Sequence, residues 1–144
     1  MENLRNAPSE FVQPGKERIV GWWLLATAGS VFLMVGIGGY TRLSKSGLSM
    51  TRWKPIGYRY PPNDEVWQEE FDNYKNTPEY QIANKQMNLE EFKFIFFVEY
   101  FHRFWGNCIG GIYTLPFLYF WARGYLKPKL RNRCLGLFGL GLSQ

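Results

Sequence analysis

The sequence predicts an all-α protein, a polytopic bundle of transmembrane helices with two complete spans and the start of a truncated third. Three observations indicate this fold. Apolar residues are concentrated in long uncharged blocks, a polar segment separates the first two blocks, and a further apolar stretch lies at the end of the sequence. The mean hydropathy of -0.29 hides this pattern, because the polar segments offset the apolar blocks in the average.

The first transmembrane helix is predicted over residues 19–41, after an N-terminal tail of residues 1–18. No charged residue occurs between Arg18 and Arg42. At about 1.5 Å per residue, this run is long enough to cross a bilayer core of about 30 Å. The tail lacks the arginine-rich pattern of a transit peptide and does not resemble a cleavable signal peptide.

Residues 42–91 are predicted to form a solvent-side loop that contains a short amphipathic helix. Trp67, Phe71 and Tyr74 recur at i, i+4 and i+7, the spacing that places side chains on one helical face. This face packs on neighbouring parts of the chain, which is the simpler interpretation, or lies on the membrane surface. The Pro-Pro-Asn sequence at 61–63 is a turn signal just before the helix.

The second transmembrane helix is predicted over residues 92–122. Asn88 followed by Glu91 resembles a capping arrangement that opens this helix. Residues 104–122 are uncharged, and together with the preceding turns they form a helix longer than a bilayer requires. The preceding turns carry Lys93, Glu99, His102 and Arg103.

The end of the sequence is predicted to hold a basic loop, 123–133, and the start of a truncated third helix, 134–144. The loop has no acidic residue, so the positive-inside rule places it in the cytoplasm or the mitochondrial matrix, on the same side as the N-terminal tail. Basic residues after the first span, such as Arg42 and Lys45, favour the opposite orientation. Residues 134–144 cover about half of the roughly 20 residues that a span needs, which predicts a fragment of a longer protein.

Neither the charge nor the cysteines indicate another class of protein. Much of the net charge of +5 comes from the loop at 123–133 rather than from a basic stripe interleaved with exposed aromatic residues, so no nucleic-acid partner is expected. Cys108 and Cys134 form no CxxC pair, and we interpret them as small buried apolar residues.

The strongest candidate for a functional site is the single histidine of the chain, His102, which follows Glu99 by three residues. A helix places these two side chains on one face. An acidic residue at the centre of a spanning helix costs roughly 2.5 to 3.5 kcal/mol, so the pair indicates a functional site by default. His102 is either an axial ligand of haem iron or a hydrogen-bonded polar residue within the membrane.

The residues near His102 likewise have two interpretations, one in which they contact a haem and one in which their role is structural. Arg103 either pairs with a haem propionate or extends to the membrane interface. Gly106 and Gly110 continue the face of His102, and their lack of side chains favours the close approach of a flat macrocycle or of another helix.

Two stretches of the sequence resemble the heme A synthase family, in the form found in mitochondria and related bacteria. They are GGYTRLSKSGLSMTRWKP, from Gly38 to Pro55, and EFDNYKNTPEYQIANKQMNLEEFKFIFFVEYFHRFWGNCIGG, from Glu70 to Gly111. The resemblance covers the sequence from about Arg18 onward. It implies eight membrane helices in two pseudo-repeated halves, and oxidation of one porphyrin methyl group of heme O to a formyl group. That reaction proceeds by two successive hydroxylations and loss of water.

The resemblance also assigns roles to Glu99, His102 and Arg42. The family's Glu-x-x-His motif falls on Glu99, as the catalytic carboxylate, and on His102, as an axial ligand of the metal. Glu99 would orient the imidazole, relay protons or stabilise charge near the reacting methyl group, and we favour a proton or charge role. Arg42, with Thr41 in the Thr-Arg-Leu motif that ends the first helix, would anchor the loop or bind a haem propionate, with extension to the membrane interface an equal alternative.

The sequence departs from the family pattern at two positions. Asn107 stands where the family commonly has an arginine, and Lys45 stands where it has an acidic residue. The loop cysteine pair of some bacterial members is absent, so electron delivery through such a pair is not expected. The partner histidine on the fourth helix and the whole second half of the family's fold lie beyond Gln144.

The expected cofactors are heme b and the substrate heme O, and the expected partners are the lipid bilayer, an electron donor and a second copy of the chain. The expected location is the mitochondrial inner membrane, or the plasma membrane in a bacterium, with several spans. One alternative is a non-catalytic membrane haem-binding or cytochrome oxidase assembly protein, in which a dimeric hairpin ligates one haem through two copies of His102. Another is a purely structural membrane hairpin.

Overall fold

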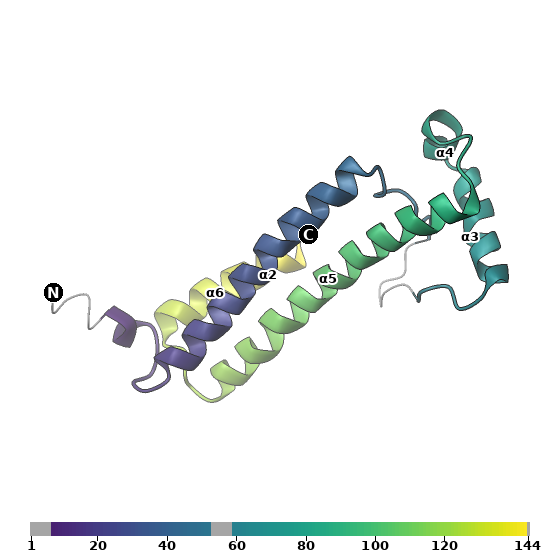
Figure 1. The fold of residues 1–144 in the computed structure, drawn as a ribbon. Helices are drawn as coiled ribbons and strands as arrows, with labels where there is room; N and C mark the ends of the chain where they lie inside the picture. The colour runs from purple at the N-terminus through teal and green to yellow at the C-terminus, as the bar shows by residue number, and fades with distance from the viewer. Residues whose placement is uncertain (1–6, 53–58, 144) are drawn as a thin grey trace. The chain divides into compact units, whose positions relative to one another are not determined.

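A computed structural model describes residues 7–52 and 59–143 (Figure 1). Its elements are η1, a 3-10 helix (Ala7–Glu10), α2 (Glu17–Leu43), α3 (Asp64–Lys75), α4 (Pro78–Ala83), α5 (Leu89–Ala122) and α6 (Pro128–Leu142). Within these described ranges, the backbone forms no strand, and its one β-type pairing is an isolated bridge between Val12 and Leu126. The predicted all-α class is confirmed.

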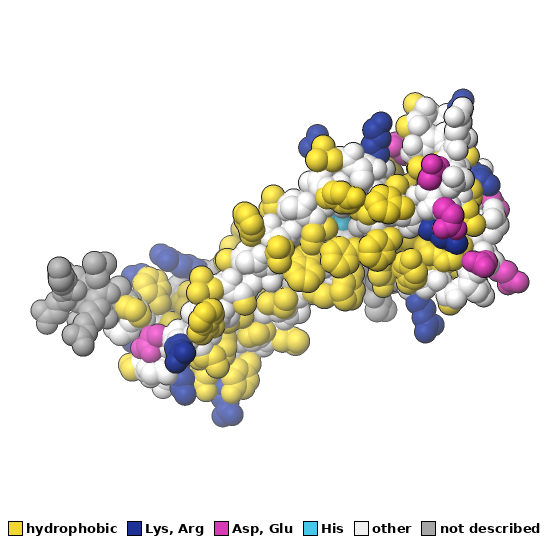
Figure 2. All heavy atoms as spheres, viewed as in Figure 1, with side chains coloured by type: hydrophobic (Ala, Val, Ile, Leu, Met, Phe, Trp, Pro, Cys, Tyr) yellow, Lys and Arg dark blue, Asp and Glu magenta, His cyan; other side chains and the backbone are white. Residues whose placement is uncertain are grey.

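Helix α2 is the one helix in the described part of the chain that is both long and apolar enough to cross a membrane. It contains the whole range 19–41 predicted for the first span. Helix α5 contains the whole range 92–122, but it is not among the helices apolar enough to count as a span, so the second span stays a prediction. Hydrophobic side chains cover much of the visible surface over both helices (Figure 2).

The chain divides into two compact units. One unit comprises residues 1–32 and 107–144, and the other comprises residues 33–106. Helices α2 and α5 run through both units, so each unit is built on one part of each long helix. The candidate site lies wholly in the second unit.

A buried apolar cluster around Trp23 forms the core of the first unit. Trp23 stacks on Tyr113 and meets Phe120 edge-on, with ring centroids 5.5 Å apart in each pair. The indole N–H of Trp23 donates a hydrogen bond to the carbonyl oxygen of Ile112 at 3.1 Å. Pro116 lies four residues further along α5 and has no N–H for that carbonyl. Trp23 therefore supplies a donor that the helix itself lacks.

The segment before α2 is hydrogen-bonded to the turn between α5 and α6. The Gln13 N–H donates to the Tyr125 carbonyl at 2.9 Å, and the Lys127 N–H donates to the Phe11 carbonyl at 3.0 Å. The ammonium group of Lys127 donates to the carbonyl of Ser9, 118 residues earlier in the chain. The described part of the predicted tail, from residue 7 onward, and the predicted basic loop therefore belong to one hydrogen-bonded structure, while residues 1–6 of the tail lie outside the described ranges.

Helix α6 begins at Pro128, six residues before the predicted start at Cys134. The prediction of a loop throughout 123–133 is therefore corrected, because its second half is helical. Proline suits the first turn of a helix, where its φ is already favourable and its missing N–H has no helical partner. The first turn of α6 holds no acidic residue of its own. Glu10 pairs with Lys129 in this turn at 2.9 Å and so places a carboxylate at the start of the helix, where a negative charge is favourable.

In the second unit, helix α3 packs its apolar face on the first turns of α5. Trp67 meets Phe96 edge-on with ring centroids 5.1 Å apart, and Phe71 lies 5.1 Å from Phe92. Tyr74 completes this buried aromatic cluster. The predicted amphipathic helix is confirmed, and its apolar side chains pack on neighbouring parts of the chain.

Side-chain caps fix where the helices of this unit begin. The Asn63 side-chain oxygen accepts a hydrogen bond from the Val66 N–H at 3.1 Å, just before α3. Before α5, the Glu91 N–H donates to the Asn88 side chain, and the Asn88 N–H donates to the Glu91 carboxylate, both at 2.9 Å. This confirms the predicted capping arrangement. Helix α4, which no pattern predicted, follows a Thr77 cap.

Tyr74 leads us to expect a loss of stability at alkaline pH. Its ring is buried, and its hydroxyl oxygen accepts a hydrogen bond from Asn84 Nδ2 at 2.8 Å. Burial raises the pKa of Tyr74 above its ordinary value of 10.0. The unfolded chain therefore ionises first, and the free energy of unfolding falls as the pH rises through 10.0. Denaturant unfolding at a series of alkaline pH values measures how steeply the free energy of unfolding falls with pH. We expect a smaller fall in Tyr74→Phe than in the native protein, and an identical fall in both would contradict the expectation.

Candidate functional site

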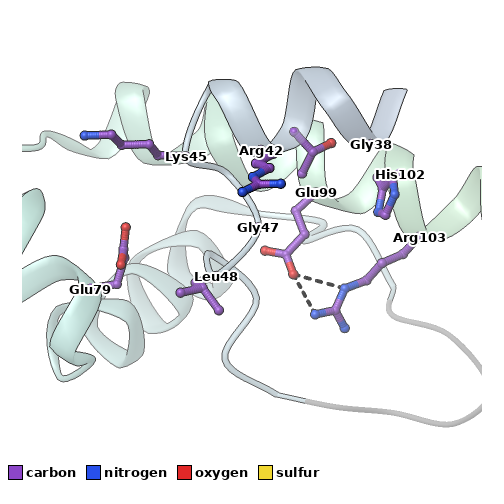
Figure 3. A pocket seen from close by; sticks show the side chains of 10 residues that line it. Gly38, Arg42, Lys45, Gly47, Leu48, Glu79, Glu99, His102 and Arg103 are labelled. Carbon is purple, nitrogen blue, oxygen red and sulfur yellow. Dashed lines mark hydrogen bonds and ion pairs between the residues drawn. The ribbon is translucent and has the colours of Figure 1, made fainter. Parts of the chain in front are cut away.

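The second unit contains a groove between the end of α2, the turn that follows it, and α5. Its cavity has a volume of about 620 Å³. Figure 3 shows side chains from both long helices around this groove, with the Glu99 carboxylate facing Arg103. The residues that line it are Gly38, Thr41, Arg42, Lys45, Gly47, Leu48, Glu79, Glu99, His102 and Arg103. All four predicted site residues are among them.

The Glu99 carboxylate is buried and fully hydrogen-bonded. One of its oxygens accepts from the Ser49 hydroxyl at 2.7 Å and from the Met50 N–H at 2.8 Å. The other oxygen accepts from Arg103 Nε at 3.1 Å and Nη2 at 2.6 Å. Glu99 therefore joins the chain segment after α2 to the face of α5 that carries Arg103.

The imidazole of His102 lies against a glycine of α2. A Cβ atom added to Gly38 would stand 3.2 Å from His102 Nε2, so the missing side chain makes room for the ring. His102 is half-buried, and among the described residues its ring has no hydrogen-bond partner. The Nε2 edge faces Gly38, so ligation of an iron atom through Nε2 requires the side chain to rotate. The Glu99 carboxylate does not hydrogen-bond this ring within the described structure.

Gly38 leads to a prediction about stability that has a matched control. Alanine is better than glycine inside a helix by about 1 kcal/mol, so Gly39→Ala, where an added Cβ meets nothing within 4 Å, should stabilise the protein by about that amount. Gly38→Ala should stabilise it less, because the imidazole of His102 must move. Unfolding free energies of the two variants measure the difference, and equal gains would show that the close contact has no energetic effect.

The turn after α2 holds a lysine in the left-handed backbone region. Lys45 has a φ of 53°, where glycine is the usual residue. The Ser46 N–H donates to the Thr41 carbonyl at 3.0 Å, and the Lys45 N–H donates to the Arg42 carbonyl at 3.2 Å. These are the two hydrogen bonds of a Schellman motif. The left-handed conformation is roughly 1–2 kcal/mol less favourable for a residue with a side chain than for glycine. The side chain of Lys45, which occupies this position, lines the groove.

Arg42 and Lys45 bring positive charge to the groove. Both are exposed, and within the described residues neither side chain makes a hydrogen bond or an ion pair. Arg103 differs, because its guanidinium is already paired with Glu99, although its side chain is 40% exposed. The predicted contact of Arg103 with a haem propionate therefore stays a prediction. Lys45, like Arg42, is a groove cation without an ion pair among the described residues.

Several residues that line the groove or hold Glu99 in place were not predicted from the sequence as site residues. Gly38, Ser49 and Met50 were missed because their contacts with α5 join segments distant in the chain. Glu79 comes from the unpredicted helix α4. The pairing of Glu99 with Arg103 had a signal in the sequence, since residues four apart on a helix are neighbours.

The donors in the groove fit an iron porphyrin. A neutral imidazole is a common axial ligand of haem iron, and guanidinium or ammonium groups bind its carboxylates. Among the described residues, no group of three or more His, Cys, Asp or Glu side chains lies together to hold a metal ion. Fold and site together define an all-helical protein with a groove suited to haem.

The chain belongs to the COX15-CtaA family of cytochrome oxidase assembly proteins, whose sequence model matches residues 21–144. It is 50% identical over 131 residues to the heme A synthase COX15 of Arabidopsis thaliana, covering 91% of this chain and 29% of that protein. It is 53% identical over 139 residues to the heme A synthase of Azorhizobium caulinodans, covering 96% of this chain and 39% of that protein. A comparison with solved structures found no match.

The human heme A synthase COX15 is 48% identical over 125 residues, which cover 86% of this chain and 30% of that protein. The chain thus spans between 29% and 39% of the length of the three relatives named here. The resemblance inferred from the two quoted stretches is confirmed for most of the chain.

Proposed function

We propose that this chain acts in heme A biosynthesis, as the part of a heme A synthase that carries the His102 groove. The reaction oxidises one porphyrin methyl group of heme O to a formyl group. The observation that supports the proposal is the groove itself, where one imidazole lies beside two cations, Arg42 and Lys45, that have no ion-pair partner in the part of the chain that the structure describes. These are the groups that an iron porphyrin with two propionates requires.

In this proposal His102 ligates the iron, and Arg42 and Lys45 bind the propionates. Bound heme O supplies the methyl group to be oxidised, and heme b is the second haem expected in the full-length family. The left-handed backbone at Lys45 supports its role, because a residue kept at an energetic cost often serves the site it lines. The electron donor and a second copy of the chain are proposed as partners from the resemblance.

We propose a positioning role for Glu99 rather than the proton or charge role favoured from the sequence. Four donors hold its carboxylate, and three of them come from Ser49, Met50 and the Nη2 atom of Arg103 at 2.8 Å or less. A carboxylate held in this way fixes the wall of the groove beside His102. A proton role would require one of these hydrogen bonds to break during turnover.

We further propose that α5 crosses the membrane together with α2, in the mitochondrial inner membrane or in the plasma membrane of a bacterium. Large apolar side chains on both helices are exposed, which is typical of surfaces that contact lipid. The pairing of Val12 with Leu126 holds the segment before α2 beside the turn after α5. Two spans satisfy this pairing, because they return the chain to the side where it started.

The test is to supply the gene to a strain that lacks heme A synthase and to analyse extracted haems by chromatography. Because the chain spans 29% to 39% of its relatives, it is joined to the remaining part of a related heme A synthase. We expect the native sequence in this form to restore heme A, and His102→Ala to leave heme O as the accumulating haem. Arg59→Gln, an exposed residue outside the groove, serves as the control and should restore heme A fully. Failure of the native gene to yield heme A, combined with haem bound to a dimer, would favour the non-catalytic haem-binding alternative.

A further inference from the structure

The first unit contains a second groove, where the beginning of α2 meets the end of α5. Its volume is about 520 Å³, and its lining residues belong entirely to this unit. Gly15 opens it with a φ of 82°, a left-handed conformation that lets the chain turn into α2. The haem proposal uses none of the residues that line it.

Among the described residues that line the groove, the charged side chains are all basic. Lys16 and Arg18 line it from the start of α2, and Tyr119 and Tyr125 line it from the end of α5 and beyond. The Lys16 ammonium lies 5.0 Å from the centre of the Tyr125 ring, while within the described residues Arg18 has no ion pair. Arg123, whose guanidinium lies 5.6 Å from the Tyr119 ring, adds a third cation close to this edge. The site is therefore complementary to an anion.

Apolar and aromatic surface continues from these charges along the helices. Trp22 is 63% exposed, Ile19 is 51% exposed and Tyr119 is 49% exposed. Aromatic rings next to basic residues at the ends of apolar helices are typical of the level of lipid headgroups. A ligand that fits must join a negative charge to apolar chains.

We propose that this groove binds the headgroup of an anionic phospholipid, with the phosphate held by Lys16 and Arg18 and the acyl chains lying along Trp22 and Ile19. Basic pockets between membrane helices on the matrix or cytoplasmic side are known to hold such headgroups. The proposal goes beyond haem chemistry. It rests on the proposed location only in requiring that α2 crosses a membrane.

The test uses the purified full chain in nanodiscs of phosphatidylcholine that contain a minor fraction of cardiolipin or phosphatidylglycerol. Lipid retained through purification is quantified by mass spectrometry, and binding is titrated. The double variant Lys16→Gln/Arg18→Gln should bind the anionic lipid about thirtyfold more weakly, the change expected for two basic residues near an anionic surface. The control Lys129→Gln/Arg133→Gln removes the same charge from the same unit outside the groove and should retain native binding.

An equal loss in both double variants would overturn the proposal, because it would show a diffuse attraction to the membrane surface. Unchanged binding in the groove variant, or displacement of the lipid by inorganic phosphate, would overturn it as well. Circular dichroism of each variant confirms that the helices remain folded. The haem spectrum of the same samples should be unaffected, so failure of haem binding in the native chain would count against the proposed function alone.

Discussion

Glu99→Ala is expected to lower the free energy of unfolding by about 2–4 kcal/mol. The substitution removes the oxygen that accepts from the Ser49 hydroxyl at 2.7 Å and from the Met50 N–H at 2.8 Å. The hydroxyl keeps the carbonyl oxygens of Ser46 and Ile95 as acceptors, so the Met50 N–H is the buried donor that loses its partner. It also removes the partner of Arg103. Arg103 is 40% exposed and regains water, so most of the loss comes from the buried Met50 N–H and from the lost hydrogen bond of Ser49 to a charged acceptor.

Glu69 provides a matched control for this prediction. It pairs with Arg52 at 2.5 Å, but both side chains are about half exposed, that of Arg52 at 46% and that of Glu69 at 56%. Glu69→Ala should therefore cost less than about 1 kcal/mol. Reversible unfolding in mixed detergent measures both variants, and an equally small loss for Glu99→Ala would show that the carboxylate does not hold the segment after α2.

Glu99→Gln separates the geometry of this carboxylate from its charge. A glutamine has nearly the same shape, but its amide nitrogen is a donor and must face one of the two pairs of donors that now approach the carboxylate. We expect a loss of stability between those of the native protein and Glu99→Ala. If Glu99→Gln is as stable as the native chain yet abolishes heme A formation, the carboxylate acts in proton or charge transfer rather than in positioning.

His102→Ala is expected to weaken haem binding by more than about 100-fold, because loss of a ligand exceeds the loss found on changing the groups that support ligands. The measurement is an optical titration of the purified protein with haem. The folded state should survive, since the ring is half-buried and has no hydrogen-bond partner among the described residues. Addition of free imidazole should restore the haem spectrum by filling the space that the side chain leaves.

Asn107→Ala, an exposed change further along α5, serves as the control for the haem titration and should bind haem as the native chain does. An unaltered haem spectrum in His102→Ala would remove the axial ligand from the proposal. In that case the groove cations, Arg42 and Lys45, would bind an anion other than a haem propionate.

Local sequence patterns were sufficient to predict α2, α3 and α5. The uncharged run of α2, the i, i+4, i+7 spacing of Trp67, Phe71 and Tyr74, and the Asn88 cap are each contained in a few turns of one helix. Such patterns are visible in a sequence because they need no tertiary contact.

The parts that were missed depend on contacts between distant segments. The start of α6 was placed too late because its basic first turns resemble a loop, and the compensating carboxylate of Glu10 comes from the other end of the chain. In the site, Glu99 and His102 were predicted from one helical face and Arg103 as the next residue along, whereas the partners Ser49 and Gly38 required the fold. The sequence resemblance supplied the chemistry of the site, and the structure adds how Glu99 is held.

The hydrogen bond from Lys127 to Ser9 has a consequence for the order in which the protein matures. Its two ends are 118 residues apart. At a synthesis rate of about 5–20 residues per second, the ribosome reaches Lys127 roughly 6–24 s after it has added Ser9. During that interval the Ser9 carbonyl lacks the donor with which it pairs in the folded protein. A tag attached to the segment before α2 would therefore compete with Lys127 for this carbonyl.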